Sequence, residues 1–198
     1  MKKSRKKQNF FVYNYSKCWK FLNEARWHIT FSLAIFMLFF LIGFTLPIFF
    51  REEIINFMKE MVRTLEGKNT IEIISYIFFN NLKAAFFALV LGVGIGFFPL
   101  LTTVVNGYVL GFASRFVATE EGIAVLWRLL PHGIFELPAI SLAIGIGIKM
   151  GFDLFEKKNR KKRLIENFRE GLRFFVFVII PLLIVAAIIE GTLIGLGV

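Results

Sequence analysis

Four long apolar stretches constrain how this chain can fold. They cover residues 28–50, 84–114, 129–148 and 174–198, and in the first of them His28 is the only ionisable side chain. About 20 apolar residues suffice for a helix to cross a hydrocarbon core of ~30 Å. Because 57% of its residues are apolar, the chain would expose too much hydrophobic surface if it folded in water. The sequence therefore predicts an all-α, polytopic transmembrane helical bundle.

The second stretch is too long for a single crossing. The 31 residues from Ala84 to Ser114 would form a helix of about 46 Å, and Pro99 lies near their middle. A break there would turn the chain back and give two membrane segments, so that the total becomes about five. Segments of roughly 15 residues are short, and re-entrant half-helices buried by protein are an alternative, with a second broken region around Pro131.

The distribution of basic residues favours the same number of crossings. Of 24 Lys and Arg residues, 17 lie within residues 1–27 and 149–173, whereas residues 51–83 carry five basic and five acidic side chains. Short cytoplasmic loops are enriched in Lys and Arg, and five crossings place both basic blocks on one side. We therefore expect a multi-pass protein of the cell membrane with its amino terminus in the cytoplasm. Basic blocks separated by membrane-spanning sequence argue against a nucleic-acid partner.

The two basic blocks differ in their expected roles. Residues 1–27 mix aromatic and basic side chains, and they predict a cytoplasmic interfacial segment anchored by Trp19 and Trp27. A single transmembrane domain, residues 28–198, follows. This domain contains a cytoplasmic basic loop, residues 149–173, and the basic segment 157–163 within it is expected to be solvated and to attract the headgroups of the lipid bilayer.

Residues 51–80 are expected to form an external amphipathic segment. Its apolar residues recur at helical spacing and end before Gly67. An apolar helix face needs a partner, which here is the outer membrane surface, the helix bundle or another protein. The apolar positions of this predicted helix are Ile54, Phe57, Met58, Met61 and Leu65.

Three ionisable residues are predicted at membrane depth. His132 and Glu136 stand four positions apart, on one face of a helix, and Glu190 lies in the last stretch. Such groups cost ~2.5 kcal/mol or more on insertion scales, so each is a candidate functional residue. They could bind a metal with a third ligand, or relay protons. As a structural alternative, the two glutamates hold the bundle together by hydrogen bonds to the backbone and to His132, Asn80, Asn81 or Asn106.

Glycines four residues apart place small faces on three segments. Such faces let helix backbones approach closely, and they favour either contacts within the bundle or the seam of a homo-oligomer, with a dimer preferred. The pairs are Gly92 and Gly96, Gly107 and Gly111, and Gly147 and Gly151.

Several short motifs, taken in order, point to a known family. These are Asn80 and Asn81, then "GVGIGFFP", "NGYVLG", "PHGIFELPA" and "AAIIEG". With them the chain resembles the stage II sporulation protein M family over residues 28–198. The resemblance implies a noncatalytic membrane anchor or scaffold, like the members that serve cell-wall-remodelling enzymes during engulfment. The signature positions that it implies are Asn81, Gly96, Pro99, Asn106, Gly107, Pro131, His132, Gly133, Glu136 and Glu190.

Two functional hypotheses follow. The first is a noncatalytic integral membrane scaffold that recruits partner proteins through its external segment, self-associates, and needs no cofactor. The second is a small transporter or proton-coupled permease that uses His132, Glu136 and Glu190 around a cavity. Because the chain has one cysteine, Cys18, an intramolecular disulfide is excluded.

Overall fold

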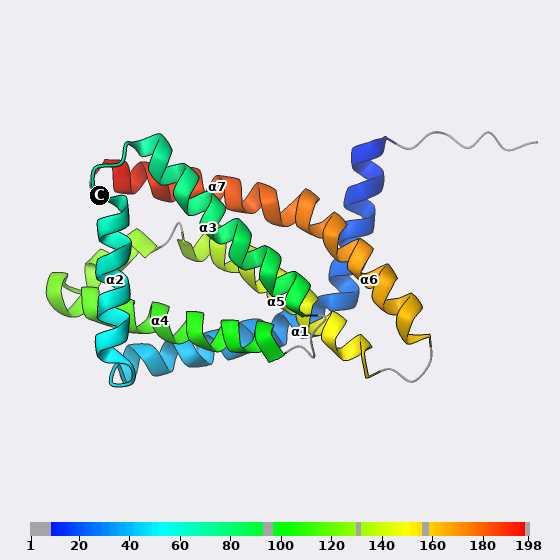
Figure 1. Ribbon diagram of the computed structural model, residues 1–198, viewed down its shortest axis with the longest axis horizontal. Coiled ribbons are helices and arrows are strands. Elements are labelled where there is room, and N and C mark those ends of the chain that lie inside the picture. Colours follow the sequence, from blue (N-terminus) through cyan, green and yellow to red (C-terminus); the bar gives the residue numbers. More distant parts are fainter. Residues whose placement is uncertain (1–8, 93–96, 130–131, 156–158, 197–198) are drawn as a thin grey trace, which may run out of the picture.

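The computed structural model describes residues 9–92, 97–129, 132–155 and 159–196, and every regular element within them is helical (Figure 1). The elements are α-helices apart from η1, a 3-10 helix, and η2 and η3, two π-helical turns. In chain order they are α1 (Phe10–Thr45), α2 (Arg51–Leu65), α3 (Thr70–Leu91), α4 (Phe97–Glu121), η1 (Ile123–Leu129), η2 (His132–Glu136), α5 (Leu137–Asp153), α6 (Arg160–Phe174), η3 (Phe175–Ile179) and α7 (Ile180–Gly195).

Five helical stretches among the described residues are long and apolar enough to cross a membrane. The predicted all-α bundle of about five membrane segments is thereby confirmed. The stretches are Phe10–Thr45, Thr70–Leu91, Phe97–Glu121, Gly133–Asp153 and Arg160–Gly195.

Helix α1 is longer than a membrane crossing requires. It begins after Asn9, whose side chain accepts a hydrogen bond from the backbone N–H of Phe11 at 3.0 Å. Its 36 residues correspond to about 54 Å, and its first turns run in a different direction from the remainder (Figure 1). From residue 10 onward, the predicted interfacial segment is thus part of the same helix as the first span. Trp19 and Trp27 are exposed on it, as interfacial anchors would be.

Helix α2 lies across one end of the bundle, over the end of α4 (Figure 1). Its Ile54 is buried against Tyr108 and Phe112 of α4. The helix ends at Leu65, close to the predicted end before Gly67. The next helix starts with a reciprocal capping box, in which Asn69 and Glu72 each accept a hydrogen bond from the other's backbone N–H. Residues 70–80 of the segment expected to be external therefore form the first half of α3.

The chain does turn back within the second apolar stretch, but before Pro99 rather than at it. Helix α3 ends at Leu91, and Pro99 lies in the first turn of α4, where a missing backbone N–H costs no hydrogen bond. The two helices are longer than half of the stretch because Lys83 lies inside α3 and Arg115 inside α4. At 22 and 25 residues, both are long enough for full crossings rather than half-helices.

Helix α5 forms the centre of the bundle, with most of its residues from Ala139 to Asp153 buried. Helices α1, α3, α4 and α6 pack against it. A Cβ atom on Gly147 would overlap the backbone of Ala88 in α3, and one on Gly92 would overlap Gly147 itself. The small residues predicted to favour close helix contacts are thus used between α3 and α5 of one chain.

The same holds for the pairing of α4 with the second half of α1. Gly107 and Gly111 of α4 lie against the backbone carbonyls of Phe36 and Phe40. The predicted homo-oligomer therefore needs a surface other than these glycines, because the neighbouring helix of the same chain already covers them.

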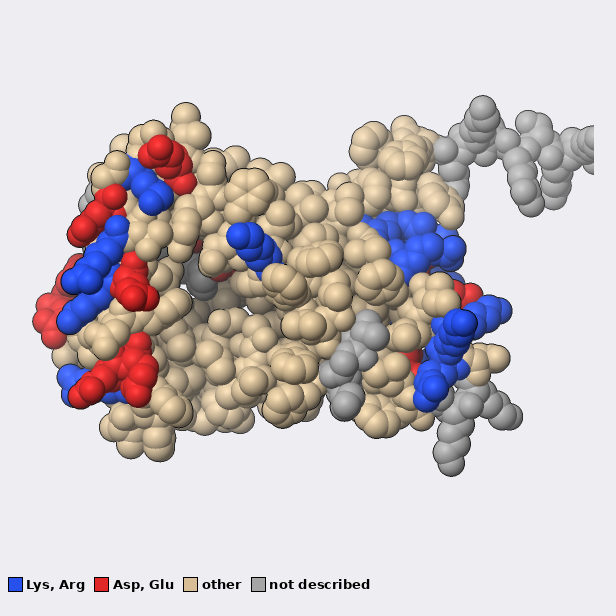
Figure 2. All heavy atoms as spheres, in the orientation of Figure 1, with Lys and Arg blue, Asp and Glu red and all other residues tan. Residues whose placement is uncertain are grey.

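The two ends of the bundle differ in charge (Figure 2). Cationic side chains gather at the end formed by the start of α1 and by α6, which we call the basic end. At the opposite end, α2 and the last turn of α4 mix acidic and basic residues, and we call this the neutral end. The broad band between them is almost uncharged. Both described basic blocks thus lie at one end of the molecule, as the five-crossing hypothesis requires.

Candidate functional site

Glu136 and Glu190 occupy the interior of the bundle. Glu136 closes the π-helical turn η2 and is 4% exposed, while Glu190 lies half-buried in α7. The Oε2 atoms of both carboxyl groups are shielded from solvent, and both side chains have interaction partners. Because η2 packs against α7, the fold brings the segments that carry the two glutamates together.

The local sequence explains why Glu136 sits in a widened turn. Leu137 and Pro138 begin α5, and a proline near a helix start lacks the N–H that would bond back to the preceding turn. The π-helical turn that precedes α5 changes the direction in which its own side chains point, and such turns are frequent at functional sites. His132 begins this turn and its side chain lies outside the described residues, as do Gly96 and Pro131.

The asparagines predicted as partners of the glutamates do not all turn inward. Asn81 is buried in α3, but its neighbour Asn80 is exposed. Asn106 is also exposed, in the middle of α4. Only Asn81 is therefore placed to take part in a buried polar cluster, whereas Asn80 and Asn106 face the surroundings of the bundle.

The remaining signature residues have packing roles or none that the structure reveals. Pro99 is fully buried, and a Cβ atom added to Gly147 would lie 3.2 Å from the Cγ of this proline. The proline therefore fixes how closely α4 approaches α5. Gly107 permits the contact between α4 and α1. Gly133 is exposed and has open space around it.

A second polar cluster lies near the basic end and was not predicted. Asp153, which ends α5, is buried; its Oδ2 accepts a hydrogen bond from Asn167 of α6, and its Oδ1 lies 3.9 Å from Nε of Arg163. Lys149, one turn earlier, is also buried, with its Nζ 5.3 Å from the ring centre of Phe21 in α1. This cluster ties α1, α5 and α6 together.

One sequence signal could have revealed this cluster. Lys149 and Asp153 stand four residues apart on one helix face. In the sequence, Lys149 marks the end of an apolar stretch and counts toward the basic block 149–173, and neither property indicates a buried contact with Asp153. Among the described residues, no three His, Cys, Asp or Glu side chains are grouped in a way that would hold a metal ion.

The comparison with protein families agrees with this architecture. The family model described as stage II sporulation protein M matches residues 32–193, a range that includes both glutamates and all five membrane stretches at least in part. The chain belongs to the stage II sporulation protein M family. This confirms the resemblance that the motifs indicate.

Two relatives of this family member come from Methanocaldococcus jannaschii, and both are uncharacterized proteins. The first is 31% identical over 145 residues, covering 70% of this chain and 64% of the relative. The second is 31% identical over 117 residues, covering 56% of this chain and 65% of the relative. The matches thus span just under two thirds of each relative. No solved structure matches the chain.

Proposed function

We propose that this protein is a noncatalytic scaffold of the cell membrane, which recruits partner proteins through α2 at the neutral end of the bundle. Membership of the stage II sporulation protein M family supports a membrane protein of that type. The observation that carries the proposal is the divided apolar surface of α2. One part of it is packed on the bundle, and another part is uncovered.

The packed part fixes α2 in place. Ile54 is buried, and Ile55 and Met58 pack beside it against α4. Phe57, Met61 and Val62 on the same short helix are exposed. A rigid helix that presents aromatic and thioether side chains, flanked by charges of both signs, is a surface suited to bind another protein.

The charge asymmetry supports an orientation for this surface. Positive residues gather at the basic end, and the bias of Lys and Arg toward cytoplasmic loops supports a cytoplasmic location for that end and for the start of α1. The neutral end and α2 then face outward. In this orientation the protein presents its docking helix on the outer face of the membrane.

We further propose that two copies associate within the membrane through α3. Asn80 and Lys83 are three residues apart on this helix, and both are exposed in the span Thr70–Leu91. An amide or ammonium group facing hydrocarbon is costly, and a second helix that accepts its hydrogen bonds relieves that cost. Because a twofold axis brings the same face of each copy together, the Asn80 amides can pair with each other.

Photo-crosslinking in native membranes tests recruitment by α2. A photoreactive phenylalanine at position 57 or 61 is expected to give a discrete adduct with another protein. The control places the same group at Ile123, which is 74% exposed on η1 at the same end but lies outside α2. Absence of any adduct at positions 57 and 61, or an equal yield at 123, would contradict the proposal.

Disulfide crosslinking tests the dimer. In a background without the native cysteine, Cys18→Ser, the substitution Asn80→Cys is expected to give covalent dimers on oxidation of native membranes. The matched control is Leu41→Cys, which is exposed in the first span on α1, a helix that packs mainly against α4 and α5. Dimers formed equally well at both positions, or at neither, would rule out an α3 interface.

The burial of Glu136 favours one rival function, a proton-coupled transporter. A carboxyl group 4% exposed at membrane depth, on a segment packed against the helix of Glu190, has the placement expected of a proton relay. Vesicles that contain the protein separate the two functions. Under the rival, Glu136→Gln abolishes a pH-dependent flux that the native protein shows, whereas a scaffold shows no flux in either form.

A further inference from the structure

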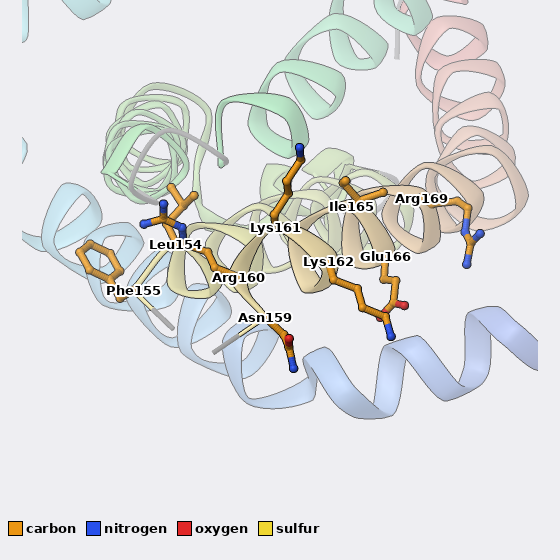
Figure 3. Close-up of a pocket in the computed structure, with 9 residues that line it drawn as sticks. All are labelled: Leu154, Phe155, Asn159, Arg160, Lys161, Lys162, Ile165, Glu166 and Arg169. Carbon is orange, nitrogen blue, oxygen red and sulfur yellow. The ribbon is translucent and has the colours of Figure 1, made fainter. Parts of the chain in front are cut away.

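The start of α6 borders an open groove of about 1130 Å³ at the basic end. Its walls come from Leu154 and Phe155, which directly follow α5, from Asn159, and from the first turns of α6 (Figure 3). Because Leu154 and Phe155 directly follow α5, this groove lies where the membrane span Gly133–Asp153 ends. A ligand in it would therefore be at the level of the lipid headgroups.

The charge of the groove is strongly positive. Four cationic residues line it, Arg160, Lys161, Lys162 and Arg169, against one carboxylate, Glu166. Within the described residues, Arg169 is ion-paired with Glu170, but Arg160, Lys161 and Lys162 form no ion pair. All three are exposed on the first turn of the helix. The positive end of the α6 dipole adds to the same potential.

Apolar side chains accompany the cations. Phe155 is 67% exposed and Ile165 is 59% exposed, and both line the groove. In Figure 3 Lys161 and Ile165 extend to one side of α6, while Lys162 and Glu166 extend to the other. A free inorganic anion would use the cations and leave the apolar groups in water. A phospholipid would use both, since its phosphate meets the cations and its glycerol and acyl carbons cover the apolar groups.

The polar cluster behind α6 keeps the groove open and in place. Asn167 and Arg163, on the side of the helix that faces α5, contact the buried carboxylate of Asp153. Gly171 of the same helix lies against Ile146 of α5. These contacts anchor α6 on α5, so the three cations of its first turn are held out on the surface rather than folded onto the protein.

We infer that the groove between the end of α5 and the start of α6 is a binding site for an anionic phospholipid of the leaflet at the basic end. The cations at the start of α6 together attract its phosphate, and Phe155 and Ile165 pack against its apolar part. This site is independent of the α2 surface, which lies at the opposite end of the bundle.

The test uses the full chain in bilayers of dioleoyl phosphatidylcholine that contain a minor fraction of dioleoyl phosphatidylglycerol. After gentle extraction, native mass spectrometry counts the lipids that remain bound. The native chain is expected to retain phosphatidylglycerol selectively. In the double variant Lys161→Gln, Lys162→Gln, the affinity for phosphatidylglycerol is expected to fall by roughly tenfold or more, since each cation near a membrane surface contributes on the order of a fivefold factor.

Two comparisons make the result specific. The control variant Lys59→Gln, Arg63→Gln removes the same charge from exposed positions on α2, at the neutral end, and should retain phosphatidylglycerol like the native chain. The variant Ile165→Ser keeps every cation and should weaken retention of the lipid.

An excess of inorganic phosphate should displace the lipid only weakly. Full displacement by phosphate would show a general anion site and overturn the inference. Equal retention by the native chain and the α6 double variant, or equal loss in the α2 control, would overturn it as well.

Discussion

The hydroxyl group of Tyr108 in α4 accepts a hydrogen bond from the backbone N–H of Phe49, with 3.0 Å between the oxygen and the nitrogen. The same hydroxyl lies 3.2 Å from the carbonyl oxygen of Leu46 and 3.1 Å from that of Phe49, and its single proton is donated to one of these acceptors or shared between them. One buried side chain thus ties the turn between α1 and α2 to the bundle. This matters because the turn sets the position of α2, the proposed docking helix.

Removing this hydroxyl should loosen α2 without unfolding the protein. Tyr108→Phe leaves the ring in its packing against Ile54 but deletes the hydrogen bonds to the turn. We expect the free energy of unfolding to fall by about 1 kcal/mol and amide hydrogen exchange within Arg51–Leu65 to become faster. Tyr76→Phe is the control, because the Tyr76 hydroxyl makes no hydrogen bond with any described residue. Unchanged exchange in α2 of Tyr108→Phe would show that the turn is held by other contacts.

The approach of α3 to α5 should tolerate no side chain at Gly147. A Cβ there would overlap the carbonyl oxygen of Ala88, so Gly147→Ala forces the two helices apart. Overpacking of this kind lowers the free energy of unfolding by about 1–3 kcal/mol. We therefore expect a lower melting temperature for this variant in detergent. Gly133→Ala is the matched control, since open space surrounds that glycine. Equal melting temperatures for both variants would contradict the packing described here.

The carboxylate of Asp153 should stabilise the junction of α5 and α6. Asp153→Ala removes the acceptor of Asn167 and the ion partner of Arg163, whose side chain is half exposed and therefore partly screened by solvent. We expect the free energy of unfolding to fall by about 1–3 kcal/mol, because a hydrogen bond to a buried charged group is lost. Thermal unfolding measures this loss of stability. The control is Glu120→Ala, because Glu120 is an exposed acidic residue at the neutral end. A loss no larger than that of Glu120→Ala would assign the cluster no structural role.

The sequence was sufficient to predict the membrane crossings because hydrophobicity and charge act over whole segments. The apolar stretches and the two basic blocks led to five spans with one positively charged end, and the helices agree. The ends of α3 and α4 differ from the prediction because Lys83 and Arg115 limit the uncharged stretch in the sequence but do not limit the helices. In the structure both lie within helices, and the guanidinium of Arg115 sits over the ring of Phe44, 5.9 Å from its centre.

The candidate site was only partly predictable for a different reason. Spacing along one helix shows which residues share a face, but it does not show what that face meets. Thus Asn80 and Asn81 looked equivalent, although one is exposed and the other buried. The glycine pairs were compatible with a dimer seam or with contacts inside the bundle, and the described glycines at 92, 107, 111 and 147 lie inside it. Which helices pack together depends on tertiary contacts that no local pattern contains.

Cysteine accessibility in intact cells tests the membrane arrangement most directly. In the Cys18→Ser background, single cysteines replace Ile123 at the neutral end and Phe155 at the basic end, which are 74% and 67% exposed. An impermeant maleimide is predicted to label Ile123→Cys in intact cells, and to label Phe155→Cys only after permeabilisation. Labelling of both positions in intact cells, or of Phe155→Cys alone, would contradict five crossings with a cytoplasmic basic end.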